Sequence, residues 1–534
     1  MGLRHRISAV SSEEGLPVGL MVLSGAIATA MVFPLLWLVI EAMRVDPGRA
    51  SELLFSVGTL DVLLNSVLLM GGVTACSVLL GVPLAYLTVR TDLPFRRFWS
   101  VTVALPLVIP SYVGAFAFVS AFGPRGEFHD LLAPLGIERL PEIYGLPGAV
   151  FVITLYTYPY VYLTTRAALL SFDTELIDAA RTLNHGRWES FRRVTLPQVR
   201  PAIAAGGLLT ALYAVSDFGT PAIMRLSVFT RQIYVEYNAF GRDYAALLSL
   251  QLLGVVLVVL ALEWAVRSEA TVRGSDADRA GSRIRLGGWR WPATLLPAAV
   301  TATALAVPVW ILLLWLVRAD FNRRPSLAFE WIQVLNSVSI AAAAALVAAL
   351  AAIPIAYFAA TNGSTLATLF ERATYVGFAV PGIVLALALV YFGAGYLPWL
   401  YQTLPLLMFA YVIRFLPQAV GSTRTSILQV DPKVVEAGRT LGESPLGAFR
   451  RITFPLTRSG IVAGAALVFL TTMKELPVTL ILRPSGFETI VTQIWRAQKN
   501  AFYQYAAVPA LILLLISGLS MVVLLSQEGG NRGL

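Results

Sequence analysis

The chain has 534 residues, of which 57% are hydrophobic and 13% are charged. Soluble domains carry about 25% charged residues, so this composition excludes an ordinary soluble protein and indicates a chain that lies in a lipid bilayer. The formal net charge is +9, and the arginines cluster in short segments between apolar runs, as in membrane topology signals. We therefore expect contact with membrane lipid and no nucleic-acid partner.

Cysteine and histidine are scarce, which limits the chemistry of the chain. The one cysteine, Cys76, lies in an apolar run, so no disulfide can form within the chain. The three histidines, His5, His129 and His185, are not spaced as metal ligands. We predict no firm metal site and no cofactor held by this chain.

Twelve apolar stretches are long enough to cross a membrane, which takes about 20 residues. In chain order they lie at 17–40, 62–89, 99–122, 147–169, 201–223, 245–266, 292–317, 334–360, 373–396, 402–421, 460–482 and 504–526. The first run is too long for a signal peptide and lacks a small-residue cleavage site, so we interpret it as a retained span. Pro106, Pro110 and the pair Pro381-Gly382 are expected to kink the third and ninth spans.

The loop charges predict the orientation of the spans. Arginines collect after spans two, four and six, namely Arg90, Arg96, Arg97, Arg181, Arg187, Arg192, Arg193, Arg200, Arg267, Arg273, Arg279, Arg283, Arg285 and Arg290. Loops rich in arginine stay on the cytoplasmic side, so we predict that both termini are cytoplasmic. The loops after spans one and three carry charges of both signs, as expected outside.

The second half of the chain repeats the first. Residues 173–206 align without a gap to residues 431–464, at a constant offset of 258. Such a repeat indicates duplicated units with the same topology, a known transporter architecture. A polar, glycine-containing segment separates them. The predicted domains are a first half of six helices at 1–267, a cytoplasmic linker at 268–291 and a second half of six helices at 292–534.

The repeated loops, 173–200 and 431–458, predict two helical hairpins on the cytoplasmic face. Each begins with an aspartate suited to cap a helix, Asp173 or Asp431, and ends where the next span begins. Small residues in the first helix would allow a partner to approach closely. The pattern favours a docking element, although a loop that only caps the helix bundle is the alternative.

These loops resemble the EAA loop of binding-protein-dependent ABC importer permeases, which have the type I permease fold. In that family the loop has Glu-Ala-Ala, then a glycine, and seats in a groove of the ATPase subunit. The resemblance assigns ATPase coupling to Asp178, Ala179, Ala180, Arg181 and Asn184 in the first half, and to Glu436, Ala437, Gly438, Arg439 and Gly442 in the second. Asp178, Asn184 and Gly438 depart from the family pattern.

The resemblance also implies the partners. A P-loop needs a lysine directly after a glycine, and the lysines of this chain, Lys433, Lys474 and Lys499, do not follow one. We therefore expect no enzymatic activity here, and Mg-ATP on two copies of a separate ABC ATPase subunit. A periplasmic or lipoprotein substrate-binding protein is the expected third component, with the chain in the bacterial cytoplasmic (inner) membrane.

Charged residues inside spans are costly, so they are candidates for function. Asp217 in span five and Glu475 in span eleven coincide at the repeat offset, and Lys474 precedes Glu475. Two facing carboxylates would suit a cationic or metal substrate in a translocation path. A buried ion pair, such as Lys474 with Asp217, is the equally weighted alternative.

The segments 216–234 and 474–495 resemble the corresponding parts of fused ferric iron permeases. The resemblance implies ferric iron as substrate, and thiamine permeases share the fused layout and remain the alternative. A secondary transporter would also have twelve spans but would lack the paired EAA loops. A membrane-embedded enzyme would need a convergent set of titratable residues, which the low charge disfavours.

Overall fold

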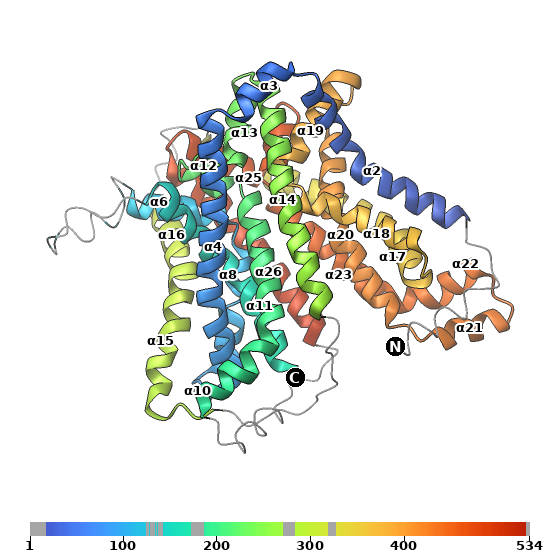
Figure 1. The fold of residues 1–534 in the computed structure, drawn as a ribbon, viewed down its shortest axis with the longest axis horizontal. Helices are drawn as coiled ribbons and strands as arrows, with labels where there is room; N and C mark the ends of the chain where they lie inside the picture. Colours follow the sequence, from blue (N-terminus) through green and yellow to red (C-terminus); the bar gives the residue numbers. More distant parts are fainter. Residues whose placement is uncertain are drawn as a thin grey trace. The chain divides into compact units, whose positions relative to one another are not determined.

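The computed structural model describes residues 18–123, 143–171, 186–270, 284–318 and 327–529, with a few positions between 124 and 142. Within these residues all regular structure is helical, apart from one isolated bridge between Thr91 and Ile284. Figure 1 shows the described chain as long helices with several short helices among them. The structure confirms the predicted all-α class.

Nine helical segments of the described chain are long and apolar enough to cross a bilayer. They are Val18–Met43 (α2), Val57–Arg90 (α4), Gly145–Leu170 (α8), Phe191–Ser216 (η3 and α11), Arg242–Glu263 (within α14, Arg242–Ala270), Gly287–Arg318 (η4, α15, η5 and α16), Trp331–Thr361 (α17), Leu404–Leu428 (α20) and Pro445–Met473 (α22, η7 and α23). Each corresponds to a predicted span.

Two more predicted spans are broken in the middle. Arg96–Val108 (α5 and η1) meets Ser111–Phe122 (α6) at 92°, and Thr365–Ala379 (α18) meets Gly382–Tyr396 (α19) at 101°. Pro110 and Pro381 lie at the two breaks, where a residue without an amide hydrogen cannot continue the helix. The expected kinks are therefore confirmed, but they are sharp bends.

The remaining predicted span, 504–526, starts as the short helix η8 (Tyr503–Ala506) and continues as α26 (Ala507–Gly529). Its described apolar part, Tyr503–Leu519, is shorter than the other spans. The shorter elements that complete the described chain are α3 (Pro47–Leu54), α10 (Arg187–Ser190), α12 (Gly219–Ile223), α13 (Phe229–Asn238), α21 (Pro432–Thr440), α24 (Pro477–Leu482) and α25 (Ile490–Lys499).

Backbone packing divides the chain into two compact units. Unit 1 comprises residues 1–46, 327–496 and 515–534, and unit 2 comprises residues 47–326 and 497–514. The first helix of the first half, α2, therefore packs within unit 1, where Phe33 and Trp37 contact Phe392 of α19. This division describes packing, whereas the predicted boundaries at 268–291 describe duplication and stay a prediction.

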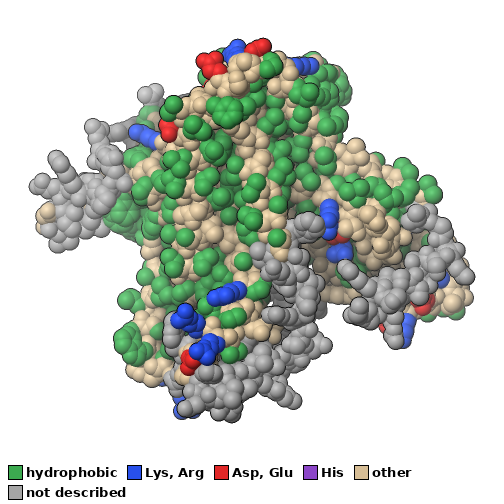
Figure 2. Space-filling view, in the orientation of Figure 1, with side chains coloured by type: hydrophobic (Ala, Val, Ile, Leu, Met, Phe, Trp, Pro, Cys, Tyr) green, Lys and Arg blue, Asp and Glu red, His purple; other side chains and the backbone are tan. Residues whose placement is uncertain are grey.

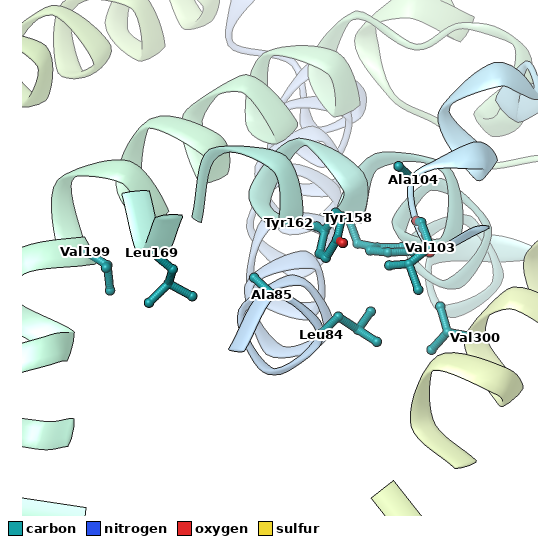
Figure 3. Packing of buried hydrophobic residues seen from close by; sticks show 9 residues of the cluster. All are labelled: Leu84, Ala85, Val103, Ala104, Tyr158, Tyr162, Leu169, Val199 and Val300. Carbon is teal, nitrogen blue, oxygen red and sulfur yellow. Dashed lines mark hydrogen bonds between the residues drawn. The ribbon is translucent and has the colours of Figure 1, made fainter. Parts of the chain in front are cut away.

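The core of unit 2 forms around the tyrosines of α8 (Figure 3). Tyr158 is fully buried, and its hydroxyl donates a hydrogen bond of 2.6 Å to the carbonyl oxygen of Val103. A buried hydroxyl without a partner would be costly, so this bond fixes the tyrosine ring among its apolar neighbours. Figure 3 shows two further members of the cluster, Leu84 of α4 and Val300 of α15.

The same helix crossing occurs in each unit, and a glycine allows it. A Cβ atom added to Gly206 of α11 would lie 2.7 Å from the Cα atom of Val161 in α8. In unit 1, a Cβ atom on Gly464 of α23 would lie 2.9 Å from the Cα atom of Ala419 in α20. Both the glycines and their neighbours correspond at the offset of 258. Small residues at such crossings let helix backbones approach closely in membranes.

The outer face of unit 2 is apolar between its ends. Figure 2 shows hydrophobic side chains spread over α4 and α14, with lysine and arginine gathered near α10. Leu64 and Leu79 of α4 and Val258 of α14 are among the exposed side chains. An apolar surface of this extent on helices of spanning length is the surface that lipid would contact.

We predict that Gly464→Leu destabilises the chain by about 1–3 kcal/mol, because the new side chain would overpack the α20–α23 crossing. Thermal unfolding of the purified chain in detergent measures this effect. Gly254→Leu in α14 is the control, since a Cβ atom there meets no other atom within 4 Å. Equal unfolding temperatures for the two variants would contradict the role of the crossing.

Candidate coupling loop and intramembrane carboxylates

The second coupling loop forms the predicted helical hairpin. Helix α21 begins at Asp431, whose side chain accepts a hydrogen bond of 3.0 Å from the amide of Lys433. Helix α22 (Pro445–Ala448) begins at Ser444, whose hydroxyl accepts one of 3.1 Å from the amide of Gly447. These side chains satisfy amide groups that have no partner within their helices. The loop is therefore an ordered element.

Two glycines shape this hairpin. Gly442, which follows α21, has a φ angle of +95°, in a region that side chains with a Cβ atom rarely adopt. A Cβ atom on Gly438 would collide with the Cδ1 atom of Ile452. The departure from alanine at position 438 therefore allows α21 to pack closely on the segment that follows it.

The remaining predicted coupling residues of this loop face outward. Glu436, Ala437 and Arg439 are exposed, and so are two apolar side chains beside them, Leu441 at 86% and Leu446 at 75%. Exposed apolar residues that lie next to charged ones are typical of a surface for another protein. The side chains offer acid, base and apolar contacts on one short hairpin.

A single π-helical turn leads into the span that follows the repeated loop in each half. In the second half it covers Phe449–Thr453, and the amide of Phe454 donates to the carbonyl of Phe449. Pro455 follows and has no amide hydrogen to donate. The first half has the same turn at Phe191–Thr195, again at the offset of 258. The π-helical turn before α11 therefore recurs before α23, at the same place in the repeated sequence.

The first-half coupling residues lie outside the described part of the chain. This holds for Asp178, Ala179, Ala180, Arg181 and Asn184. Their assignment to ATPase coupling stays a prediction, as does the matching assignment of Glu436, Ala437, Gly438, Arg439 and Gly442.

Asp217 ends α11 and caps the short helix that follows. One carboxylate oxygen accepts a hydrogen bond of 3.1 Å from the amide of Gly219, and the other accepts one of 2.9 Å from the hydroxyl of Ser111. The Asp217 carbonyl accepts from Thr230 of α13 at 2.7 Å. Tyr213 donates to Ser111 at 3.2 Å. In the described residues, the side-chain partners of this carboxylate are therefore neutral hydroxyl and amide groups.

Glu475 occupies the corresponding place in the second half but has a cationic partner. Its carboxylate accepts a hydrogen bond of 3.0 Å from the Nε atom of Arg414 in α20; the Glu475 side chain is buried and that of Arg414 is partly buried. Arg414 also donates to the carbonyl of Val380 at the bend between α18 and α19, at 2.7 Å. Arg414 was not among the residues predicted from the sequence, and the alternative raised there, an ion pair of Lys474 with Asp217, stays a prediction. Lys474 lies half-buried at the end of α23.

The position of Arg414 in the sequence could have predicted its pairing with a carboxylate. It is an arginine inside an apolar span, and at the offset of 258 it takes the place of Tyr156. Pro417 and Pro159 confirm that register, since both lie three residues further on. An unpaired arginine in a span is costly, so it predicts a carboxylate close by.

The residues opposite the two carboxylates also differ in size. Ser111 follows Pro110 at the bend before α6, and Gly382 follows Pro381 at the bend before α19. A Cβ atom on Gly382 would lie 2.5 Å from a carboxylate oxygen of Glu475. The shorter aspartate thus faces a serine that reaches it, whereas the longer glutamate needs a glycine opposite it.

In the described residues, no three histidine, cysteine, aspartate or glutamate side chains gather in a group that could hold a metal ion. Asp217 and Glu475 therefore belong to no such group among the described residues. A role for either in the translocation path stays a prediction.

We predict that Arg414→Met alone destabilises the chain by about 3–5 kcal/mol, because it leaves Glu475 buried without its cation. The double variant Arg414→Met with Glu475→Leu should recover most of this loss. A double-mutant cycle of thermal unfolding measures the coupling. Arg44→Met is the control: its pair with Glu41 has the same 3.0 Å distance, but the arginine is 58% exposed, so the effect should stay below about 1 kcal/mol. Additive effects of the two buried substitutions would contradict the pairing.

Comparison with known proteins gives relatives along the full length of the chain. It is 31% identical over 513 residues to the Fe(3+)-transport system permease protein FbpB 2 of Haemophilus influenzae, covering 95% of this chain and 98% of the relative. It is 27% identical to the probable ABC transporter permease protein y4fN of Sinorhizobium fredii, with 97% and 96% covered. It is 23% identical to the ferric transport system permease protein FbpB of Actinobacillus pleuropneumoniae, with 85% and 69% covered.

One family model matches the chain twice, at residues 77–273 and 352–527. The two matches contain both repeated loops, both helix crossings and both intramembrane carboxylates. Together they cover well over half of the chain. The chain therefore belongs to the family of binding-protein-dependent transport system inner membrane components, in the form of a fused permease with two halves.

Proposed function

We propose that this chain is the permease subunit of an ATP-driven importer for ferric iron. The substrate rests on two relatives whose names state ferric transport, one of which matches almost the full length of both chains. Membership of the permease family supports a transport subunit without enzymatic activity of its own, which works with an ATPase and a substrate-binding protein.

The exposed hairpin of the second half supports the coupling step. Glu436 and Ala437 lie on the outer surface of α21, and the close contact of Gly438 with Ile452 ties that helix to the π-helical turn before α23. A force on α21 would pass into α23 through this contact. We propose that one ATPase subunit seats on each hairpin, so two copies bind Mg-ATP and drive alternating access.

Asp217 supports the cationic substrate better than Glu475 does. The charge of Glu475 is balanced by Arg414, whereas the described partners of the Asp217 carboxylate are uncharged. A carboxylate oxygen is a ligand that hard cations prefer. We propose that Asp217 contributes to the cation path, and that Glu475 and Lys474 have a structural role within unit 1.

The arginine-rich loops support a chain with both termini in the cytoplasm of a bacterium. The coupling hairpins would then face the cytoplasmic ATPase. Helix α11 begins next to α10 and ends before α12, so α12 lies toward the other end of unit 2 (Figure 1). A binding protein would deliver its ligand to that opposite side.

We predict that ferric-loaded binding protein stimulates ATP hydrolysis by the chain reconstituted with its ATPase, and that iron-free protein does not. Phosphate release in proteoliposomes measures the stimulation. Thiamine-loaded binding protein serves as the comparison. Stimulation by thiamine alone would contradict the iron assignment, and failure of any ATPase to associate would contradict the importer.

We predict that Glu436→Lys lowers the stimulated hydrolysis at least about tenfold, because it reverses a charge on the proposed ATPase seat. The amount of inserted, folded chain should not change, since Glu436 is exposed. Glu330→Lys is the control, as it reverses an exposed carboxylate just before α17. Full stimulation by the Glu436 variant would contradict the coupling role.

A further inference from the structure

Helices α13 and α25 are repeats of one another and are anchored alike. Both contain a Gln-Ile-aromatic sequence, at 232–234 and 493–495. In unit 2, the side chain of Asn65 donates to the carbonyl of Ser227 at 3.1 Å, and Ser66 accepts from the amide of Phe229 at 3.1 Å. These bonds fix the residues just before α13 against α4.

Unit 1 has the same pair of anchors. Asn336 of α17 donates to the carbonyl of Glu488 at 2.9 Å, and Ser337 accepts from the amide of Ile490 at 2.8 Å. Glu488 therefore occupies the position that Ser227 has in unit 2. The two sites can therefore be compared within one chain, at an offset of 261 for these anchored residues.

In unit 1 a carboxylate lies between two arginines at this position. Glu488 accepts a hydrogen bond of 2.8 Å from Arg496, and its distance to Arg483 is 3.5 Å. The three side chains are partly buried. One oxyanion therefore serves two guanidinium groups, which would otherwise repel each other.

Unit 2 keeps two arginines but lacks the carboxylate. Arg225 matches Arg483 at the offset of 258, and Arg231 lies on α13, where it donates to the hydroxyl of Ser227 at 3.1 Å. A hydroxyl is neutral and cannot balance either charge. Burial, together with the nearby Arg225, lowers the pKa of Arg231. Among the described residues, Arg231 contacts Ser227 and Arg225 lies over Tyr144, and neither arginine forms an ion pair with a carboxylate.

The backbone holds Arg225 in an unusual conformation at this site. Its φ angle is +57°, whereas Arg483 has a φ of −61°. Met224 before it accepts from the amide of Gly145 at 2.8 Å, and Leu226 after it donates to Pro221 at 2.9 Å. The guanidinium lies 4.8 Å from the ring centre of Tyr144. Strained residues held by their surroundings in this way cluster at ligand sites.

We propose that Arg225, Ser227 and Arg231 form a binding site for an oxyanion, a carboxylate or phosphate, in the place that the Glu488 carboxylate occupies in unit 1. The ligand would accept hydrogen bonds from both guanidinium groups and from the Ser227 hydroxyl. Free phosphate and the phosphate of an anionic lipid share this chemistry. The site does not depend on what the chain transports.

A ligand here would be linked to the candidate cation path through α13. Thr230, next to Arg231 on α13, donates to the carbonyl of Asp217. Ser227 is held to α4 by Asn65. An oxyanion that joins Arg225 to Arg231 would therefore brace the segment between Asp217 and α13.

Binding can be tested on the full chain in nanodiscs of phosphatidylcholine, without ATPase or iron. Inorganic phosphate should bind in calorimetry and raise the unfolding temperature. Arg225→Gln and Arg231→Gln should each weaken binding at least about tenfold. Arg290→Gln is the control, because Arg290 is likewise an arginine of unit 2 that lies over an aromatic ring, that of Trp291.

Ser227→Glu is the decisive variant, because it supplies the carboxylate that unit 1 already has. It should abolish phosphate binding and raise the unfolding temperature in the absence of phosphate. Phosphate binding that is unchanged in this variant, or in both glutamine variants, would overturn the proposal.

Nanodiscs that contain phosphatidylglycerol distinguish the two sources. If the lipid headgroup is the ligand, the anionic lipid stabilises the chain and suppresses phosphate binding, and both effects disappear in Arg231→Gln. If free phosphate is the ligand, its affinity is the same in both lipids. If phosphate does not bind and the anionic lipid does not stabilise the chain, the proposal is overturned. Since no transport is measured, a negative result here leaves the proposed function untouched.

Discussion

The fold depends on how backbone amide and carbonyl groups find hydrogen-bond partners where a membrane-spanning helix is interrupted. Lipid offers no donors or acceptors, so a broken helix in a membrane must find its partners within the protein. Asp217 and Glu475 meet this need. Each follows the end of a span, and each carboxylate accepts from an amide of the short helix that comes next, Gly219 in α12 and Val478 in α24.

The same two carboxylates show how duplicated scaffolds diverge. Backbone features are repeated with little change: the glycine crossings, the π-helical turns and the asparagine–serine anchors recur in both halves. The polar side chains at the charged sites are not repeated in the same way. Asp217 is bound by a serine where Glu475 is bound by an arginine, and Glu488 lies between two arginines where Ser227 cannot balance them. Each substitution changes the local charge and leaves the backbone in place.

This divergence is consistent with a permease in which the halves share a frame but differ in task. A single polypeptide can vary one copy of a site independently, which two identical subunits cannot do. In unit 1, Glu475 pairs with one arginine and Glu488 contacts two, so each of these carboxylates has a cationic partner. In unit 2, the described hydrogen-bond partners of the Asp217 carboxylate and of Arg231 are uncharged, and these are the positions where we propose that ligands bind.

Much of the architecture was accessible from the residues alone. Apolar runs predicted the spans because a helix that crosses a bilayer needs about 20 mostly apolar residues. The repeat offset predicted that Asp217 and Glu475 would occupy equivalent positions in the two halves. The helical hairpin at 431–458 could be predicted because Asp431 is a residue type that caps helix N-termini. These features depend on local pattern, which the sequence carries directly.

The partners of each charge were decided by packing between segments far apart in the chain. Arg414 and Glu475 are 61 residues apart, and Ser111 and Asp217 are 106 apart. Which of several arginines or hydroxyls reaches a carboxylate depends on helix crossings and bends, such as the 101° bend beside Gly382. The sequence alone showed that Asp217 and Glu475 needed partners, but only the three-dimensional packing selected a neutral hydroxyl for one and a cation for the other.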